Sequence, residues 1–126
     1  MRLKIAHEYR CAYCSTVRTA AVREEVAPKE QALFDDDLDS DIFSQREQSA
    51  IRLADHLSEN PHGISDVFFE ALREVFTDDE TIELLLFASL EVGLDRFCIA
   101  LQLDTTQRSR YPTDLDYPCD NPEPQD

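Results

Sequence analysis

The sequence predicts an all-α protein, and three features support this fold class. The chain has 126 residues but only two glycines, Gly63 and Gly93, so it lacks the turn residues that tight β-hairpins need. Apolar residues recur at spacings of three and four, which is the helical period. Helix-capping sequences precede several of these periodic segments. The length suits one domain with a core of its own.

The N-terminal part of the chain is predicted to form two helices, over residues 2–9 and 11–26. Pro28 then suits the first turn of a third, short helix, because that position needs no backbone N–H. The apolar face of the first helix is formed by Leu3, Ile5 and Ala6.

Two further helices are predicted from their caps. Ser44 and Glu47 have the spacing of a capping box, which predicts a helix from about residue 44 to 58. The segment 60–63, Asn-Pro-His-Gly, ends that helix, and Ser65 can cap the next one. The residues expected to face inward on this next helix are Phe68, Phe69, Leu72, Val75 and Phe76.

A second capping box, at Thr77 and Glu80, begins a long helix that we expect to run to about Leu103. This helix is apolar nearly all round, so we expect it to be the central helix, buried on most sides or shared with another subunit. The composition changes at Asp104. Residues 1–104 are therefore predicted as one helical domain, and the acidic, proline-containing tail 105–126 as disordered.

The charge of the chain excludes several classes of partner. The formal net charge is −15, from 27 acidic against 12 basic residues, so we expect no binding to nucleic acid or to an anionic membrane surface. The acidic run 35–37 is interpreted as a solvated loop. No apolar run reaches the roughly 20 residues of a membrane span. The first residues are too short and too charged for a secretory signal, so the expected location is the cytoplasm.

The pair Cys11 and Cys14, two residues apart, is the feature most indicative of chemistry. In a reducing compartment this spacing favours a dithiol that cycles with a disulfide. A helix beginning near Cys11 would direct its unpaired N–H groups at the sulfurs and favour thiolate. Arg18, four residues after Cys14, would lie one helical turn away and lower the thiol pKa further. The distant Cys98 is expected to have no role.

Two other interpretations of the pair remain, half of a metal site or a vestigial pair. Zinc would need two more ligands, and no second paired motif supplies them. We therefore predict no metal and no cofactor. The residues from which such ligands would have to come are His7, His56, His62, Cys98 and Cys119.

Several separate segments together resemble the alkylhydroperoxidase D-like proteins, which are grouped with the carboxymuconolactone decarboxylases. The resemblance covers roughly residues 1–104. Residues 3–14 resemble the family's helix leading into its Cys-aromatic-Cys turn, and residues 95–97, Asp-Arg-Phe, stand where the family often has an Asn-Arg-Phe-like turn. The segments that resemble its other helices are 43–47, 50–55 and 76–84.

The resemblance implies an all-helical protein that assembles as a trimer, hexamer or related homo-oligomer with helices shared between subunits. It also implies that Cys14 attacks peroxide and that Cys11 resolves the product into a disulfide, with a dithiol as electron donor. The residues alone favour Cys11 as the more acidic thiol, because it stands at the helix start. The identity of the nucleophile stays open.

Two departures from the family pattern concern proton transfer. Arg18 stands where the peroxidases have a histidine, and a guanidinium cannot accept a proton. Counting back three turns from Cys11 reaches Met1 or beyond, so no residue matches the relay glutamate; Glu8 and His7 are nearby substitutes. We therefore expect a thiol peroxidase or disulfide oxidoreductase, with a non-catalytic oligomeric relative as the alternative. The cysteine pair argues against lactone decarboxylation, whose branch lacks it.

Overall fold

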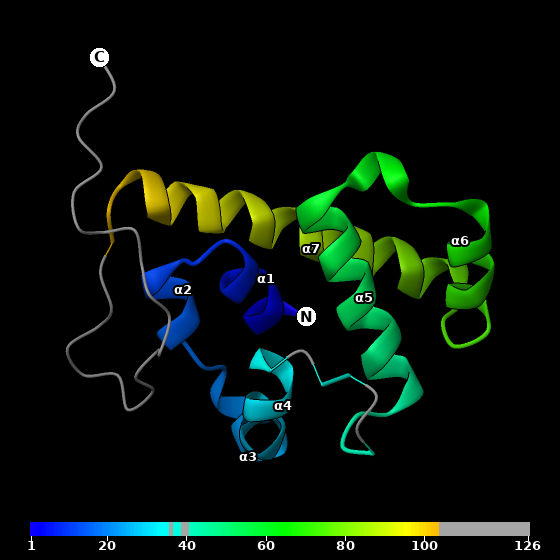
Figure 1. Cartoon of the computed structure of the whole chain (residues 1–126), viewed down its shortest axis with the longest axis horizontal. Helices are drawn as coiled ribbons and strands as arrows, with labels where there is room; N and C mark the ends of the chain where they lie inside the picture. Colours follow the sequence, from blue (N-terminus) through cyan, green and yellow to red (C-terminus); the bar gives the residue numbers. More distant parts are fainter. Residues whose placement is uncertain (36, 39–40, 104–126) are drawn as a thin grey trace.

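The computed structural model describes residues 1–35, 37–38 and 41–103, and this part of the chain is a helical bundle without strands (Figure 1). The predicted all-α class is confirmed for these residues, whereas the predicted tail 105–126 lies outside them. In chain order, the helices and the short 3₁₀ turns (η) are α1 (Arg2–Glu8), α2 (Ala12–Thr16), η1 (Ala20–Val22), α3 (Arg23–Val26), η2 (Ala27–Lys29), α4 (Glu30–Phe34), α5 (Gln45–Glu59), η3 (Pro61–Gly63), α6 (Asp66–Arg73) and α7 (Asp78–Ala100).

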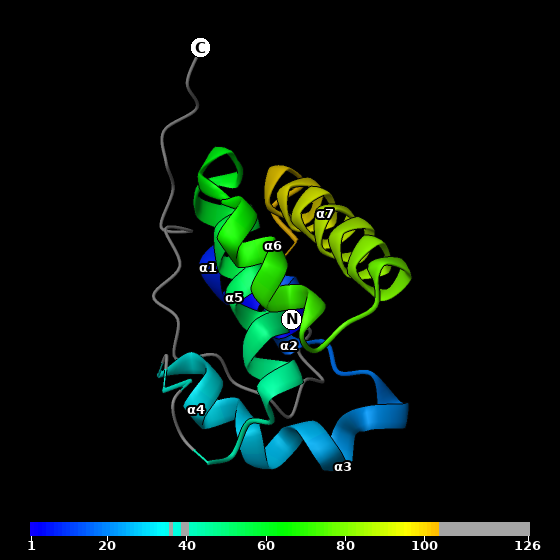
Figure 2. The same cartoon turned by 90° about the vertical axis from the view of Figure 1, so that its right-hand side faces the viewer.

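The short helix α1 is the centre of the bundle. It packs against α2, α4, α5 and α7; Figure 1 shows it between these elements, and in Figure 2 it is partly hidden behind α5. Four successive residues of α1, from Leu3 to Ala6, are buried. Where α1, α5 and α7 meet, Ile5, Ala54 and Ala88 are fully buried, and the two alanines let the helices approach closely. The C-terminal helix, which was expected to be central, shares this position with α1, since α7 also packs against α1, α2, α5 and α6.

One of the buried residues of α1, Lys4, carries a charge. Its ammonium group lies 2.8 Å from the Glu8 carboxylate and 3.5 Å from Asp55 of α5. A buried ammonium ion is tolerated only when it is paired, and these two carboxylates supply the pairing. The contact to Asp55 also joins α1 to α5.

The starts of α5, α6 and α7 agree with their predicted caps. Both capping boxes are present, Ser44 with Glu47 and Thr77 with Glu80, and the Ser65 side chain accepts the backbone N–H at the third position of α6. The five residues predicted to face inward all pack in one cluster with Leu53 of α5, although α6 ends at Arg73 and the last two, Val75 and Phe76, follow it. Pro28 lies at the start of a short helical segment, as predicted.

Helix α7 ends at Ala100 rather than near Leu103. Gln102 adopts a left-handed conformation with φ of 54°, which an α-helix cannot continue through. The N–H groups of Gln102 and Leu103 bond back to the carbonyls of Ile99 and Cys98, which closes the helix as a Schellman motif. The backbone at Cys98 is thereby fixed.

Within one chain α7 buries only one of its faces, so the first of the two predicted alternatives, burial on most sides, does not hold, and sharing with another subunit stays a prediction. Its buried residues are the small or polar Thr81, Ala88, Asp95 and Cys98, so the helix is not buried on most sides within one chain. Residues 95–97 are helical and form no turn. The opposite face exposes large apolar side chains at spacings of three and four: Ile82, Leu86, Leu90, Leu94, Phe97 and Leu101. Among the described residues, no helix combines the length and the apolarity that crossing a bilayer requires.

The predicted single helix over residues 11–26 is interrupted at Thr16. Val17 is extended, and the chain resumes as the turn η1 and the short helix α3. The β-branched residues Thr16, Val17 and Thr19 disfavour a helix here. The Thr16 hydroxyl also donates to the carbonyl of Tyr13 at 2.8 Å, an alternative to the helical pattern.

Candidate functional site

The cysteine pair lies where the chain turns from α1 into α2. Arg10 has φ of 53°, and the N–H groups of Arg10 and Cys11 bond to the carbonyls of His7 and Ala6. This is a Schellman motif, which ends α1 and reverses the chain direction. It places Cys11 at the N-cap of α2 and Cys14 in the first turn. The start of a helix near Cys11 is thus confirmed.

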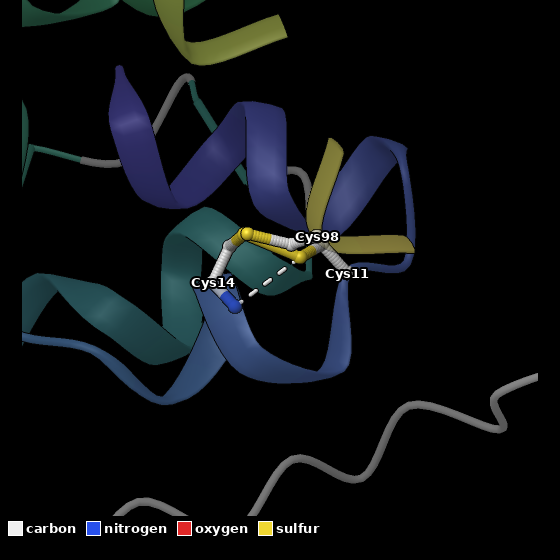
Figure 3. Close-up of side chains that lie close together, drawn as sticks. All are labelled: Cys11, Cys14 and Cys98. Atoms are coloured by element: carbon white, nitrogen blue, oxygen red, sulfur yellow. Dashed lines mark hydrogen bonds between the residues drawn. A yellow bond between two sulfur atoms is a disulfide. The ribbon is translucent and has the colours of Figure 1, made fainter. Parts of the chain in front are cut away.

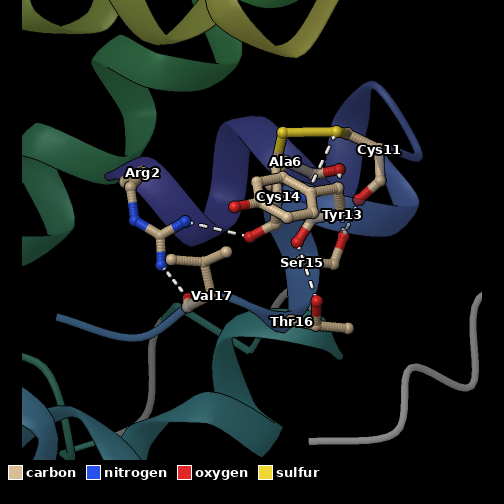
Figure 4. Close-up of a disulfide and its surroundings, with 8 residues drawn as sticks. All are labelled: Arg2, Ala6, Cys11, Tyr13, Cys14, Ser15, Thr16 and Val17. Atoms are coloured by element: carbon tan, nitrogen blue, oxygen red, sulfur yellow. Dashed lines mark hydrogen bonds between the residues drawn. A yellow bond between two sulfur atoms is a disulfide. The ribbon is translucent and has the colours of Figure 1, made fainter. Parts of the chain in front are cut away.

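Cys11 and Cys14 are joined by a disulfide, with their Cα atoms 5.3 Å apart (Figure 4). The backbone N–H of Cys14 donates to the Cys11 sulfur at 3.2 Å. A hydrogen bond to sulfur favours its charged form, so this contact would stabilise a Cys11 thiolate in the reduced protein. Both residues are buried: Cys11 is 1% exposed and Cys14 is 7% exposed. Cys14 is therefore the more accessible of the two.

A third sulfur lies beside the pair. The sulfur atoms of Cys11, Cys14 and Cys98 all lie within 4.8 Å of one another, and Figure 3 shows Cys98 of α7 next to the disulfide. Cys98 is a free thiol and is 9% exposed. Together with Ala6 these residues form one apolar cluster. The expectation that Cys98 has no role in the site overlooked this packing, which brings together residues 84 positions apart.

Asp95, one turn before Cys98 on α7, is the second residue that sequence reasoning missed. Its side chain is 1% exposed, and neither carboxylate oxygen has a hydrogen-bond partner in the described part of the chain. Burial, and next the nearby Glu91 charge, raise the pKa of Asp95 to about 7, while Arg2 acts in the opposite direction. Burial, Asp95 and Glu91 likewise raise the pKa of the Cys98 thiol.

Arg2 provides the cationic contact to the cysteine turn. Its guanidinium donates to the carbonyl of Cys14 at 2.9 Å and to the carbonyl of Val17, at the C-terminal end of α2 (Figure 4). Cations are favoured at a helix C-terminus, where carbonyls lack intrahelical partners. Burial lowers the pKa of Arg2, and Glu91 of α7 opposes that effect. Its spacing from the cysteines gave no indication of this contact.

The predicted role of Arg18 required it to share a helix with Cys14, and it does not. The helix ends at Thr16, and Arg18 follows in an extended segment. Its guanidinium forms two hydrogen bonds to the Glu30 carboxylate, at 2.6 and 3.0 Å, and one to the Ser15 carbonyl at 2.5 Å. Arg18 therefore braces α2 against α4, and its register with the Cys14 sulfur was wrongly predicted.

The two substitutes proposed for the relay glutamate have other contacts. Glu8 pairs with Lys4, and the His7 ring stacks on Phe34 of α4 with centroids 5.1 Å apart. A pocket of about 280 Å³ is lined by Arg2, Arg18, Arg23 and Thr19 together with apolar side chains, and none of the three cysteines lines it.

The arrangement can support thiol chemistry. Two sulfurs can bond, a third lies within reach, and one buried carboxyl group holds or releases a proton near neutral pH. Comparison of the chain with protein-family models, with curated proteins and with solved structures finds no match. The resemblance to the alkylhydroperoxidase D-like proteins therefore rests on the sequence pattern alone.

Proposed function

We propose that this protein is a thiol-dependent oxidoreductase that cycles Cys11 and Cys14 between dithiol and disulfide, with an organic hydroperoxide as oxidant and a small dithiol as reductant. The observation that supports this most strongly is the disulfide at the N-terminal turn of α2. The backbone there offers an N–H to the Cys11 sulfur, which favours a reactive thiolate.

In the proposed cycle, the Cys14 thiolate attacks the terminal oxygen of the hydroperoxide. A sulfur–oxygen bond forms, the oxygen–oxygen bond breaks, and the alkoxide takes a proton and leaves as alcohol. The Cys11 thiolate then attacks the Cys14 sulfenic acid, so that a disulfide forms and the oxygen leaves with a proton as water. An external dithiol reduces the disulfide by exchange and becomes oxidised itself.

The roles of the two cysteines follow from their surroundings. Cys14 is the less buried sulfur, which supports its contact with an external oxidant. Cys11 accepts the N–H of Cys14, which supports a resolving thiolate already aimed at its partner. Arg2 holds the carbonyls at the end of α2 and is assigned as a positioning residue. Arg18, which its spacing from Cys14 was expected to place one turn from the sulfur, braces the same helix through Glu30.

Turnover of tert-butyl hydroperoxide with dihydrolipoamide as electron donor tests this proposal. The expected result is dithiol-dependent consumption that Cys14→Ser and Cys11→Ser abolish. The matched control, Cys119→Ser, removes a cysteine from the tail, outside the described residues, and should leave the rate unchanged. Equal slow consumption by wild type and Cys14→Ser would refute the peroxidase activity.

A non-catalytic role is the second candidate, and burial of both sulfurs favours it. A protein that had kept only the fold would hold the pair as a packing element of the α1–α2–α7 contact. The two candidates differ in the thiol pKa: a value clearly below the ordinary 8.5 or so supports the enzyme, and an ordinary value at both cysteines supports the alternative. The pH dependence of alkylation of each cysteine measures this.

We also propose that the exposed apolar face of α7 is covered by a second copy of the chain. Ile82 is 64% exposed and Leu86 is 62% exposed, and contiguous apolar surface of this kind marks an interaction site. Gly93 lies on the same face, and a Cβ there would meet no atom within 4 Å. A mid-helix glycine costs about 1 kcal/mol relative to alanine, and no contact within the described residues requires a glycine at this position. The close approach of a helix from a second copy of the chain would require a residue without a side chain here.

Light scattering after size-exclusion chromatography tests this assembly. We expect the wild type to be oligomeric, and we expect Leu90→Glu and Gly93→Leu to dissociate it while retaining helical content. Glu70→Gln, an exposed change on α6 and therefore outside this face, is the control. A monomeric wild-type protein would refute the assembly without affecting the proposed thiol chemistry.

A further inference from the structure

The three sulfurs occupy a buried, apolar cluster that brings together two elements distant in sequence. Cys11 and Cys14 come from the α1–α2 turn and Cys98 from α7, and all three are buried (Figure 3). The Schellman motifs at the ends of α1 and α7 fix the backbone on both sides of the cluster. The positions of the three sulfurs are therefore set by folding.

The spacing of the sulfurs suits coordination of one ion once the disulfide is reduced. Three thiolates at the corners of a triangle around an ion, each at a bond length of about 2.3 Å, lie about 4 Å apart. The three sulfurs already lie within 4.8 Å of one another. Reduction removes the Cys11–Cys14 bond, so small side-chain rotations suffice to form such a triangle.

The number and type of ligands select the ion. Thiolates select soft ions such as copper(I) and zinc. Zinc sites in proteins almost always have four ligands, and no fourth side-chain donor belongs to this cluster among the described residues. The burial of the sulfurs also leaves little access for water as a fourth ligand. A three-coordinate ion is the better fit.

A buried acidic residue lies close to the three sulfurs and has to be compatible with a bound ion. The Asp95 carboxylate is 1% exposed, lies one turn from Cys98, and has no hydrogen-bond partner in the described residues. Buried polar groups are satisfied in the great majority of cases, so an orphaned carboxylate requires an explanation. Three thiolates with one copper(I) ion carry a net charge of −2, so the bound site is compatible with Asp95 only in its neutral, protonated form, which needs no counter-ion.

The geometry points to a copper(I) site in which the reduced Cys11, Cys14 and Cys98 supply three thiolate ligands. It rests on the reversible reduction of the Cys11–Cys14 pair that the proposed function also requires. Binding of the ion displaces the thiol protons and leaves the oxidation states unchanged. Disulfide formation removes two of the three ligands, so the bound and the oxidised states exclude one another.

Anaerobic titration of the reduced full-length chain with copper(I), in competition with a chromophoric copper(I) chelator, tests the site. We expect one ion per chain in the wild type and an affinity more than about 100-fold lower in Cys98→Ser, since loss of a ligand exceeds the effect of an outer-shell change. Cys119→Ser is the matched control and should bind as the wild type does. Circular dichroism of Cys98→Ser and Cys98→Ala, each compared with the wild type, shows whether a loss of copper(I) binding comes from misfolding.

The coordination number is measured by X-ray absorption, where we expect three sulfur neighbours and no fourth ligand. Copper(I) binding by Cys98→Ser that is as tight as in the wild type would overturn the assignment. So would a four-coordinate zinc complex of the wild type from which copper(I) does not displace the zinc. Alkylation of Cys11 and Cys14 in the same samples reports whether the pair cycles. If it cycles while copper(I) binding is independent of Cys98, only the metal site fails; if it cannot be reduced, both proposals fail.

Discussion

Replacement of Asp95 by asparagine should stabilise the protein at alkaline pH and not at acidic pH. The pKa of Asp95 is raised from 3.8 to about 7 in the folded chain by burial and by Glu91, with Arg2 opposing and Cys98 as the other titratable group near it. Well below pH 3.8 the Asp95 carboxyl group is protonated in both the folded and the unfolded chain. As the pH rises from 3.8 to 7, only the unfolded chain ionises freely, so the folded state loses stability over that window.

The magnitude follows from the size of the shift. About three pKa units correspond to about 4 kcal/mol, and residual water around the cluster reduces this, so we expect about 2 kcal/mol at pH 8. Urea unfolding followed by circular dichroism, on metal-free reduced protein at one concentration, measures the difference at pH 4 and at pH 8. The gain should be present at pH 8 and disappear near pH 4.

The matched control is Glu83→Gln, which removes the same charge from an exposed position of α7. It should change the stability little at either pH. If Asp95→Asn gave the same free-energy change at both pH values, or no more than Glu83→Gln gives, the inferred penalty for ionising Asp95 would be refuted.

Three other predictions concern the fold. Arg10→Gly should raise the free energy of unfolding by about 0.5–1 kcal/mol, because glycine adopts the left-handed conformation at φ 53° without strain; a decrease in urea unfolding would contradict this. Lys4→Ala should lower it by about 2 kcal/mol, since the buried Lys4 loses its ion pairs with Glu8 and with the half-buried Asp55; an unchanged midpoint of thermal unfolding would contradict this. The hydrogen bond from Arg46, and then that from the backbone, lower the pKa of Glu80 to about 2, so its capping contribution should hold above pH 4.5 and be lost as the pH falls through 2; an NMR titration midpoint near 4.5 would disprove it.

The parts of the fold that the sequence predicts are those set by local chemistry. Ser44, Ser65 and Thr77 each offer a side-chain oxygen to backbone N–H groups three residues on, and each begins a helix where its position indicates. The interruption at Thr16 is local too, but its β-branched neighbours were outweighed by the expectation of a continuous helix. Arg18 was misassigned as a consequence, because its inferred register with Cys14 required that helix.

The site depends on long-range packing that spacing along the chain does not encode. Cys98 reaches the cysteine pair only because α7 turns its small and polar face inward. A signal for this was present: Thr81, Ala88 and Asp95 recur every seven residues in a helix whose other positions are largely apolar. Such a stripe marks the face that contacts the rest of the chain, and Cys98 lies on it. Arg2 gave no comparable signal.

Differential alkylation of the cysteines before and after one equivalent of hydroperoxide tests the redox pair most directly. Reduced protein should lose two thiols on oxidation, peptide mapping should place both at Cys11 and Cys14, and a dithiol should restore them. Cys98 and Cys119 should remain alkylated to the same extent throughout. If Cys11 and Cys14 stayed fully reactive after oxidation, or if no dithiol recovered them, the redox pair would not exist as a functional unit.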